Sequence, residues 1–279
     1  MSETATSRFL LANGLRHYLR DGGTGTAVLM LHGFPDTGAL WRYQIQPLIA
    51  AGHRVIVPDL RGRGLTEAPS ATGDYHLDHV VSDVLGILDA LEIQEVHLVA
   101  QDWGASAGWR MVALHPQRFS SYVSIAIGHP STGGSPTQQQ LQMSWYRCLF
   151  ARPDAEALLQ ERDWYLLRQL VLGSPDADRY VDDLRRPQAL TAALAWYRAN
   201  LAMETLLAAP PALPPITRPT LGLWGSEDKL LAEHPISGSG RFVQSSWRYV
   251  RLEGIGHWIS LEAPQVLTES LVTFWNALK

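Results

Sequence analysis

The fold is decided by the stretch Val96-His97-Leu98-Val99-Ala100-Gln101-Asp102-Trp103-Gly104, which lies in the first half of the 279-residue chain. Its first half is an apolar run, typical of a strand that a parallel sheet buries on both faces. Two small residues, Ala100 and Gly104, stand two positions before and two after Asp102. Small residues there let the backbone turn tightly from a strand into a helix. The stretch therefore predicts a reactive Asp102 at a strand-to-helix turn.

Further apolar runs on both sides of this stretch predict other strands of the same sheet. They are Val28–Leu31, Val55–Val57, Tyr122–Ile127, Thr220–Trp224 and Tyr249–Leu252. Helix-like segments such as Val80–Leu91 stand between them, and a last helix is expected from Pro264 to about Ala277. Such alternation predicts an α/β fold, in which helices cover both faces of a parallel sheet.

The alternation stops between residues 130 and 214, where the chain reads as one helix after another. A turn-rich stretch, Pro130–Pro136, opens this region, and a cluster of prolines at 210, 211, 214 and 215 closes it. Proline clusters stop helices and mark boundaries. We therefore expect two domains: a core of residues 1–129 and 215–279, and an inserted helical domain of residues 130–214.

Composition excludes several classes of partner. The net charge is −4 with histidine neutral, and no long basic run is present. Binding to nucleic acid or to an anionic membrane needs clustered lysine and arginine, so we expect neither. The polar start Met1–Arg8 lacks an apolar signal core, and no stretch reaches the ~20 apolar residues that span a bilayer. The single cysteine, Cys148, cannot form an internal disulfide. That fits a reducing compartment, so we expect a soluble, cytoplasmic protein, with a homodimer as one open option.

No metal or cofactor is expected from the sequence. His76 and His79 are three residues apart, but no further ligand clusters with them. No glycine-rich phosphate loop follows a strand with the required spacing.

Ser106 is a second candidate nucleophile, because Gly104-Ala105-Ser106-Ala107-Gly108 matches the pattern Gly-x-Ser-x-Gly. It stands four residues past the predicted strand end and would lie a full turn into the helix, whereas a nucleophile at the turn follows the strand at once. The choice decides the chemistry. A carboxylate that attacks a saturated carbon forms an ester that water can cleave, whereas serine would form a stable ether. Asp102 is the preferred interpretation and predicts such a displacement.

His257 is the candidate base. It lies in the glycine-flanked loop Glu253-Gly254-Ile255-Gly256-His257 after the last predicted strand. It needs a carboxylate that fixes its tautomer and stabilises its charged form. Asp228 is the best candidate for that carboxylate, and Glu227 is the adjacent alternative.

A loop after the first predicted strand, His32-Gly33-Phe34-Pro35, is the candidate oxyanion hole. One donor would be the backbone N–H of Phe34 and the other that of Trp103, the residue after the nucleophile. The alternative is a Gly-Pro turn that only redirects the chain.

Four stretches together carry a resemblance to a known family. They are His32-Gly33-Phe34-Pro35, Asp59-Leu60-Arg61-Gly62-Arg63-Gly64, Gln101-Asp102-Trp103-Gly104 and Gly256-His257-Trp258. The chain resembles the epoxide hydrolase group of the α/β-hydrolase fold, which is also similar to the haloalkane dehalogenases. The resemblance implies a mostly parallel twisted sheet with helices on both faces and an inserted helical cap. Family members often have histidine where Gln101 stands, but glutamine can still hydrogen-bond.

The resemblance also implies two cap tyrosines that hold an epoxide oxygen. Their family settings match Ser144-Trp145-Tyr146 and Trp196-Tyr197-Arg198, which assigns the role to Tyr146 and Tyr197. A phenol is protonated at neutral pH and can donate to an oxygen that gains charge. The alternative is that both only pack under the cap. Phe34, Trp103 and Trp145 are expected to contact the substrate.

The expected reaction is hydrolysis of a small apolar epoxide to a diol. A haloalkane dehalogenase is the first alternative: it would use Asp102 and His257 but needs N–H donors for the halide, such as the indoles of Trp103 and Trp145. A serine esterase acting through Ser106 is the second, and a non-catalytic binding protein of the same fold is the third. Which substrate is used, and where its ring opens, are not legible from the sequence.

Overall fold

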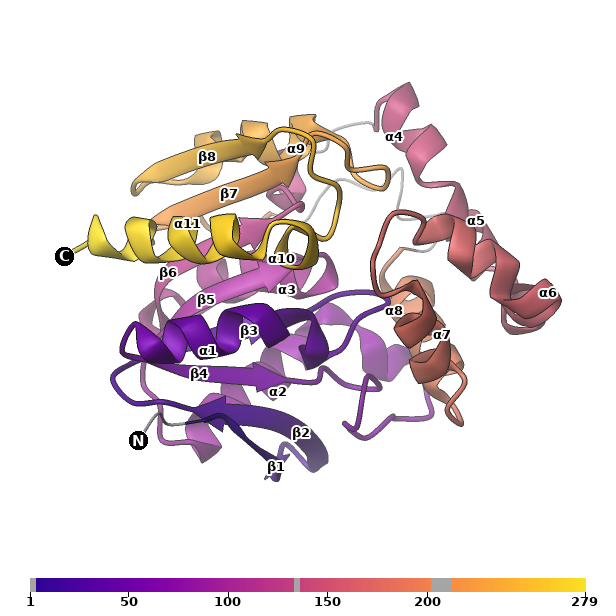
Figure 1. Ribbon diagram of the computed structural model, residues 1–279, viewed down its shortest axis with the longest axis horizontal. Helices are drawn as coiled ribbons and strands as arrows, with labels where there is room; N and C mark the ends of the chain where they lie inside the picture. The colour runs from indigo at the N-terminus through magenta and orange to yellow at the C-terminus, as the bar shows by residue number, and fades with distance from the viewer. Residues whose placement is uncertain (1–3, 133–135, 202–211) are drawn as a thin grey trace.

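The computed structural model describes residues 4–132, 136–201 and 212–279. Its centre is an eight-stranded sheet in the order β1-β2-β4-β3-β5-β6-β7-β8 (Figure 1). The strands from β4 to β8 pair in parallel, whereas β1 and β2 are antiparallel to their neighbours. The bounds are β1 Thr6–Ala12, β2 Leu15–Gly22, β3 Thr26–Leu31, β4 His53–Pro58, β5 Val96–Gln101, β6 Phe119–Ile125, β7 Thr220–Gly225 and β8 Trp247–Leu252. The predicted α/β fold with a mostly parallel sheet is confirmed.

The N-terminal hairpin β1–β2 was not predicted. Most of β1 is exposed, so it lacks the apolar run that marks the central strands. A local signal was present, because Asn13-Gly14 joins the two strands with both residues at positive φ, +51° and +76°. Asn-Gly is the preferred pair for such two-residue hairpin turns.

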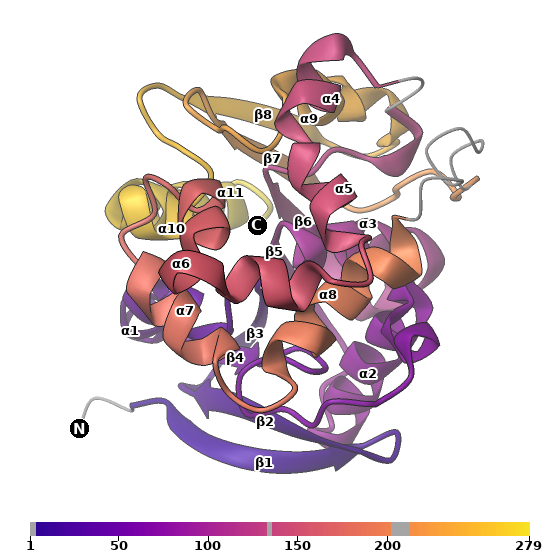
Figure 2. The same cartoon turned by 90° about the vertical axis from the view of Figure 1, so that its right-hand side faces the viewer.

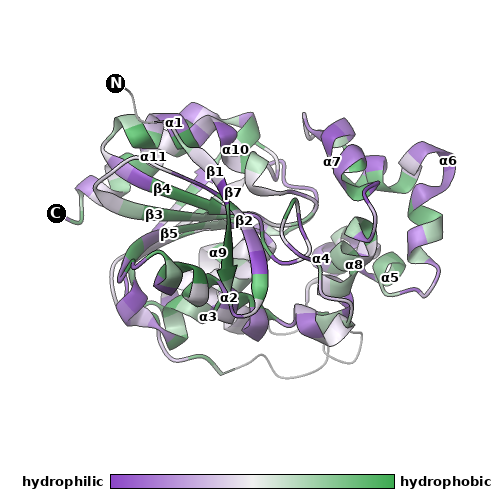
Figure 3. Ribbon diagram, turned by 90° about the horizontal axis from the view of Figure 1, so that it is seen from below, coloured by the Kyte–Doolittle hydropathy of each residue, from purple (hydrophilic) through white to green (hydrophobic). Residues whose placement is uncertain are grey.

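Helices cover both faces of the sheet, as the alternation predicted (Figure 3). On one face lie α1 (Arg42–Ala50), α10 (Ile259–Glu262) and α11 (Pro264–Asn276). On the other lie α2 (Leu77–Ala90) and α3 (Trp103–Leu114). A short helix, α9 (Glu233–Ser237), follows β7, and 3-10 turns occur at η1 Gly38–Trp41, η2 Thr72–Tyr75, η3 Pro116–Arg118, η4 Pro130–Thr132 and η6 Gly238–Phe242. The predicted end of β6 at Ile127 was wrong by two residues, because Ala126 turns to a φ of +68° and ends the strand.

Five helices lie between β6 and β7 in the described part of the chain. They are α4 (Gln138–Met143), α5 (Trp145–Phe150), α6 (Ala155–Leu170), α7 (Ala177–Leu184) and α8 (Ala189–Asn200). Figure 2 shows α5 to α8 in front of the ends of the central strands, and we call α4 to α8 the inserted helices. Of the prolines expected to close this region, those at 210 and 211 lie outside the described residues. No helix of the described ranges combines the length and apolarity that a bilayer crossing requires.

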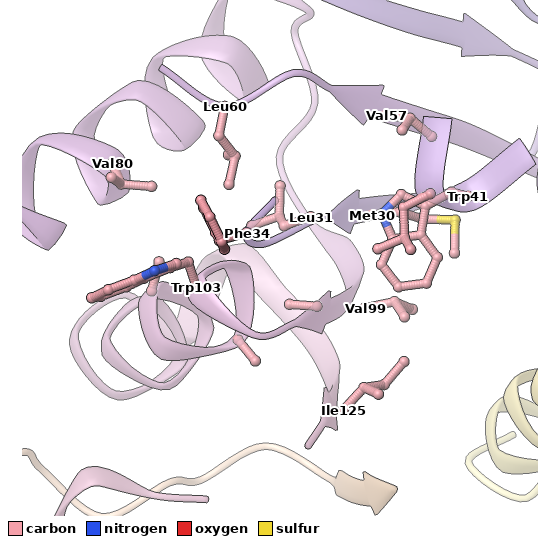
Figure 4. Close-up of a cluster of buried hydrophobic side chains, with 14 of the residues drawn as sticks. Met30, Leu31, Phe34, Trp41, Val57, Leu60, Val80, Val99, Trp103 and Ile125 are labelled. Carbon is pink, nitrogen blue, oxygen red and sulfur yellow. The ribbon is translucent and has the colours of Figure 1, made fainter. Parts of the chain in front are cut away.

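The topology places a site at the carboxyl ends of β3 and β5. These strands are neighbours, with Leu31 opposite Ala100, and the helices that follow them, α1 and α3, pack on opposite faces of the sheet. Ligands of open α/β sheets bind in the crevice where the connections diverge in this way. The strands beneath are anchored by fully buried side chains such as Met30, Leu31 and Val99 (Figure 4).

Candidate active site

Asp102 occupies the turn between β5 and α3, and the predicted strand-to-helix turn is confirmed. Its backbone φ and ψ are +52° and −123°, a conformation that residues other than glycine rarely adopt. The first helical hydrogen bond runs from the Ser106 N–H to the Asp102 carbonyl at 2.9 Å. Gly104 lies against the end of β3, where an added Cβ would be 2.7 Å from the Leu31 carbonyl oxygen. Only a residue without a side chain lets helix and strand approach this closely.

The loop after β3 holds the Asp102 carboxylate. The Phe34 N–H donates to Asp102 Oδ1 at 2.7 Å. A Cβ on Gly33 would lie 2.2 Å from the same oxygen, so glycine is required there. The His32 ring braces the loop, because its Nε2 accepts the Leu60 N–H at 3.0 Å. Burial lowers the pKa of His32 to about 3, which keeps this ring neutral. The loop therefore presents a backbone donor at the carboxylate, as an oxyanion hole requires.

His257 and Asp228 form a buried pair after β8 and β7. Nδ1 of His257 is 2.8 Å from Asp228 Oδ2, and the other oxygen, Oδ1, accepts the N–H groups of Leu230 and Leu231 at 2.7 and 2.9 Å. The alternative, Glu227, is exposed and pairs with Lys229. Burial alone would lower the pKa of the imidazole, but Asp228, followed by the charge of Asp102, raises it to about 9. The order nucleophile, acid, histidine along the chain matches the triad order of this fold.

Tyr146 on α5 and Tyr197 on α8 meet at the same place. Both are buried, and their rings pack edge to face with centroids 5.9 Å apart. Burial, followed by the charge of Asp102, raises the pKa of the Tyr197 phenol well above its usual value. Burial also raises the pKa of Tyr146, with Arg147 opposing and Asp102 adding to the rise. Both phenols are therefore held in the protonated, donating form.

Asp102, Tyr146 and Tyr197 line one small pocket. The pocket lies between the core and the inserted helices, and its walls are Phe34, Pro35, Asp102, Tyr146, Leu170, Val171, Tyr197, Leu230 and Trp258. The sequence-predicted nucleophile, both tyrosines and Phe34 are thus brought together.

The two tryptophans expected to contact the substrate lie elsewhere. Trp103 is buried beside Phe34 (Figure 4), with its ring edge-on to Tyr197 at 5.1 Å, and it backs the pocket rather than lining it. Trp145 is 44% exposed on the outer side of α5 and is absent from the pocket wall. Sequence reasoning could not separate it from Tyr146, because adjacent residues on a helix point in different directions.

Ser106 lies one turn into α3, as its spacing indicated. Within the described ranges its hydroxyl has no hydrogen-bond partner, and it faces a different pocket, which His76, Trp109 and Asn200 also line. The His257–Asp228 pair is absent from that pocket's wall. Among the described residues, no hydrogen bond links Ser106 to a base of the kind that activates a serine.

Gln101 takes a supporting position. Its side-chain amide donates to the His257 carbonyl at 2.9 Å and ties the loop after β8 to the end of β5. A hydrogen-bonding side chain is sufficient for this contact.

A buried carboxylate beside the pocket was missed by the sequence reasoning. Asp36 follows the Phe34-Pro35 pair and accepts hydrogen bonds from Arg179, Tyr180 and Trp258. Its position directly after the oxyanion loop was a weak signal. The partners from α7 and from the loop after β8 are distant in sequence, so no motif could join them.

The described residues include no cluster of three or more histidine, cysteine, aspartate or glutamate side chains placed to hold a metal ion. The arrangement offers the chemistry of a carboxylate, a carboxylate-paired imidazole and two phenols.

Comparison with known proteins agrees with this geometry. The profile of the α/β hydrolase fold family matches residues 26–264. An AB hydrolase superfamily protein of Bacillus subtilis is 30% identical over 96% of both chains, and an epoxide hydrolase of Caballeronia sordidicola is 29% identical over 95% of this chain and 92% of its own. The crystal structure of an epoxide hydrolase from Vigna radiata superposes with a TM-score of 0.83 at 28% identity, covering 98% of each chain. The predicted resemblance to the epoxide hydrolase group is confirmed, and the chain belongs to the α/β hydrolase fold family.

Proposed function

We propose that this hydrolase opens an epoxide to a vicinal diol through an ester on Asp102. The observation that carries the proposal is a single pocket lined by the Asp102 carboxylate and by both Tyr146 and Tyr197. A carboxylate opposite two phenols matches the two needs of epoxide opening, which are attack at carbon and stabilisation of the departing oxygen. Relatives named epoxide hydrolase align with nearly the whole chain.

In the first step, Asp102 attacks one ring carbon, the C–O bond of the ring breaks, and the electron pair moves to the oxygen. Tyr146 and Tyr197 donate hydrogen bonds to that oxygen, and one of them gives it a proton. Their raised pKa values keep both phenols protonated until the oxygen becomes more basic.

In the second step, His257 removes a proton from water, and the hydroxide attacks the ester carbonyl of Asp102. The Phe34 N–H, which already binds Asp102 Oδ1, stabilises the oxyanion together with the Trp103 backbone N–H. Asp228 stabilises the imidazolium. The tetrahedral intermediate then breaks its bond to the alkoxide oxygen, and Asp102 becomes a carboxylate again. Of the two water protons, one goes to the departing alkoxide, which leaves as the diol, and the other returns to the tyrosine. Ester formation also removes the Asp102 charge, which adds to the larger effect of Asp228 in raising the His257 pKa, so the imidazole binds its proton less tightly when water must be activated.

A haloalkane dehalogenase fits less well. A halide needs side-chain N–H donors at the pocket, whereas Trp103 lies behind Tyr197 and Trp145 faces outward. Phenols at those positions favour an oxygen as the group that departs.

The test is a single turnover with an aryl epoxide in ¹⁸O-water, followed by mass analysis of diol and protein. The proposal expects ¹⁸O in the Asp102 peptide rather than in the first diol released, and His257→Gln should trap the alkyl ester on that peptide. Asp102→Ala should abolish turnover. Halide release without diol would favour the dehalogenase. Substrate-derived mass on Ser106, or its labelling by a fluorophosphonate, would favour the esterase.

We further propose that residues 130–214 act as a cap domain over the core, since the inserted helices supply Tyr146 and Tyr197 to the pocket wall. The preferred substrate is small and apolar, because Phe34, Leu170, Val171 and Leu230 line the pocket. A cytoplasmic location and a homodimer stay predictions, which fractionation and sedimentation would test.

A further inference from the structure

A buried carboxylate, Asp36, connects three parts of the molecule beside the pocket. It is 2% exposed. Its Oδ1 accepts from Arg179 Nη2 at 2.5 Å, and its Oδ2 accepts from the Tyr180 hydroxyl at 2.9 Å and from the Trp258 indole N–H at 3.1 Å. Charge-assisted hydrogen bonds of this kind are strong, and breaking a buried pair leaves an uncompensated charge. The position of Asp36 is therefore coupled to that of all three donors.

The Trp258 contact reaches the candidate base. Trp258 directly follows His257, and its ring packs edge to face on the imidazole with centroids 5.1 Å apart at 85°. The same indole lines the pocket at Asp102. A hydrogen bond that fixes the rotation of the indole therefore also fixes one wall of the space around the imidazole.

The Arg179 and Tyr180 contacts reach the inserted helices. Both residues belong to α7, and Arg179 continues to Asp176, which forms a two-pronged pair with Arg42 of α1. From the opposite side, Arg63 donates to the backbone carbonyl of Asp36 at 3.1 Å. The loop that presents the Phe34 N–H is thus clamped between α7 and the core.

We infer that Asp36 is a positioning residue that holds Trp258 against His257 and ties α7 to the loop that presents the Phe34 N–H, and that it serves the ester-hydrolysis step. This inference rests on the proposed function. Burial raises the pKa of Asp36 to about 6 even though Arg179 and Tyr180 oppose the rise. The charge of Asp36 is also among those that raise the His257 pKa, so the two groups are electrostatically coupled.

The experiment compares Asp36→Asn with a matched control, Asp83→Asn. Asp83 is similarly buried at 3% and is paired with Arg61 at 2.7 and 2.8 Å, and it does not line the pocket. Rapid-quench measurements with an aryl epoxide give the rates of ester formation and decay, and histidine NMR gives the titration of His257. For Asp36→Asn we expect ester decay to slow about tenfold, with formation changed less than about twofold, and the His257 pKa to fall. Asp83→Asn should lose stability but keep both wild-type rates and the wild-type titration.

Each outcome decides the inference. If Asp36→Asn loses only stability, with wild-type ester decay and His257 titration, Asp36 is a purely structural group and the inference is overturned. If the wild-type protein opens no epoxide, the proposed function fails, and the NMR titration alone still reports whether Asp36 and His257 are coupled. If Asp36→Asn does not fold, Trp258→Phe replaces it, because it removes the indole donor and keeps an aromatic ring. Normal ester decay in that variant would contradict the inference.

Discussion

The turn at Asp102 and the inserted helices place their functional groups by different means. In the core, backbone contacts fix the carboxylate: the Phe34 N–H binds it at 2.7 Å, and Gly33 lies flat against it. In the inserted helices, Tyr197 is held by the edges of aromatic rings, with Phe150 at 4.8 Å and Phe34 at 5.3 Å. Backbone contacts tolerate almost no change, whereas ring packing can readjust at modest cost. The position of the Asp102 carboxylate is thus tightly fixed, whereas the positions of the tyrosines that would bind the epoxide oxygen can adjust.

Among the variants considered, Gly33→Ala should have the largest effect, because it disturbs the backbone contacts that fix the Asp102 carboxylate. The new Cβ would overlap Asp102 Oδ1, which it would approach to 2.2 Å, and would push the carboxylate off the Phe34 N–H. We expect kcat to fall by about 10²–10³-fold, the usual cost of losing one oxyanion donor, with ester formation and hydrolysis both slowed. Single-turnover kinetics would measure the two steps.

The matched control is Gly73→Ala, since a Cβ at Gly73 meets nothing within 4 Å. That variant should retain wild-type rates. Equal losses in the two variants would mean that the close approach of Gly33 has no catalytic consequence.

In the inserted helices, Tyr197→Phe or Tyr146→Phe should reduce the rate by less than Gly33→Ala does. Each keeps the ring packing but removes one hydroxyl, and a hydrogen bond to a charged oxygen contributes about 1.5–3 kcal/mol. Ester formation should therefore slow by roughly 10- to 100-fold, while hydrolysis of a preformed ester stays near normal, because its oxyanion binds the core. Tyr165→Phe on α6, whose side chain is 44% exposed, is the control. Slowed hydrolysis with normal ester formation would reverse the roles assigned to the two regions.

The same comparison explains what the sequence could and could not predict. Asp102, His257 and Phe34 stand at fixed positions relative to predicted strands, so local pattern and chain order indicated their meeting. The partners of Asp36 could not be predicted, because they come from α7 and from the loop after β8. Trp145 and Tyr146 were treated alike because they are neighbours, yet only Tyr146 faces the pocket. The packing direction of an inserted helix is a tertiary property that a short motif does not carry.

The pair of His257 and Asp228 can be tested by itself through the pH dependence of stability. The pKa of His257 is raised from 6.5 to about 9, so this group adds stability that is complete below pH 6.5 and is lost as the pH rises through about 9. The Tm of the wild type minus that of His257→Gln should therefore be larger at pH 6 than at pH 9.5, by a few degrees. Thermal unfolding monitored by circular dichroism would measure it. A difference that grows with pH would show that the imidazole is neutral in the folded protein and would contradict the assigned charge.

The smallest effect on kcat and KM is expected for substitution of Trp145 on α5. Its ring is 44% exposed and absent from the pocket wall, so Trp145→Ala should change kcat and KM by less than about twofold and stability by under ~1 kcal/mol. Trp196 on α8 is the matched contrast, since it is 3% exposed and its indole donates to the Arg61 carbonyl at 3.2 Å. Its replacement by alanine should cost about 3–5 kcal/mol of stability, as large cavities do. Steady-state kinetics and urea unfolding of both variants would measure these values. A large rise in KM for Trp145→Ala alone would place this ring in contact with the substrate, which would require α5 to rotate when the pocket is filled.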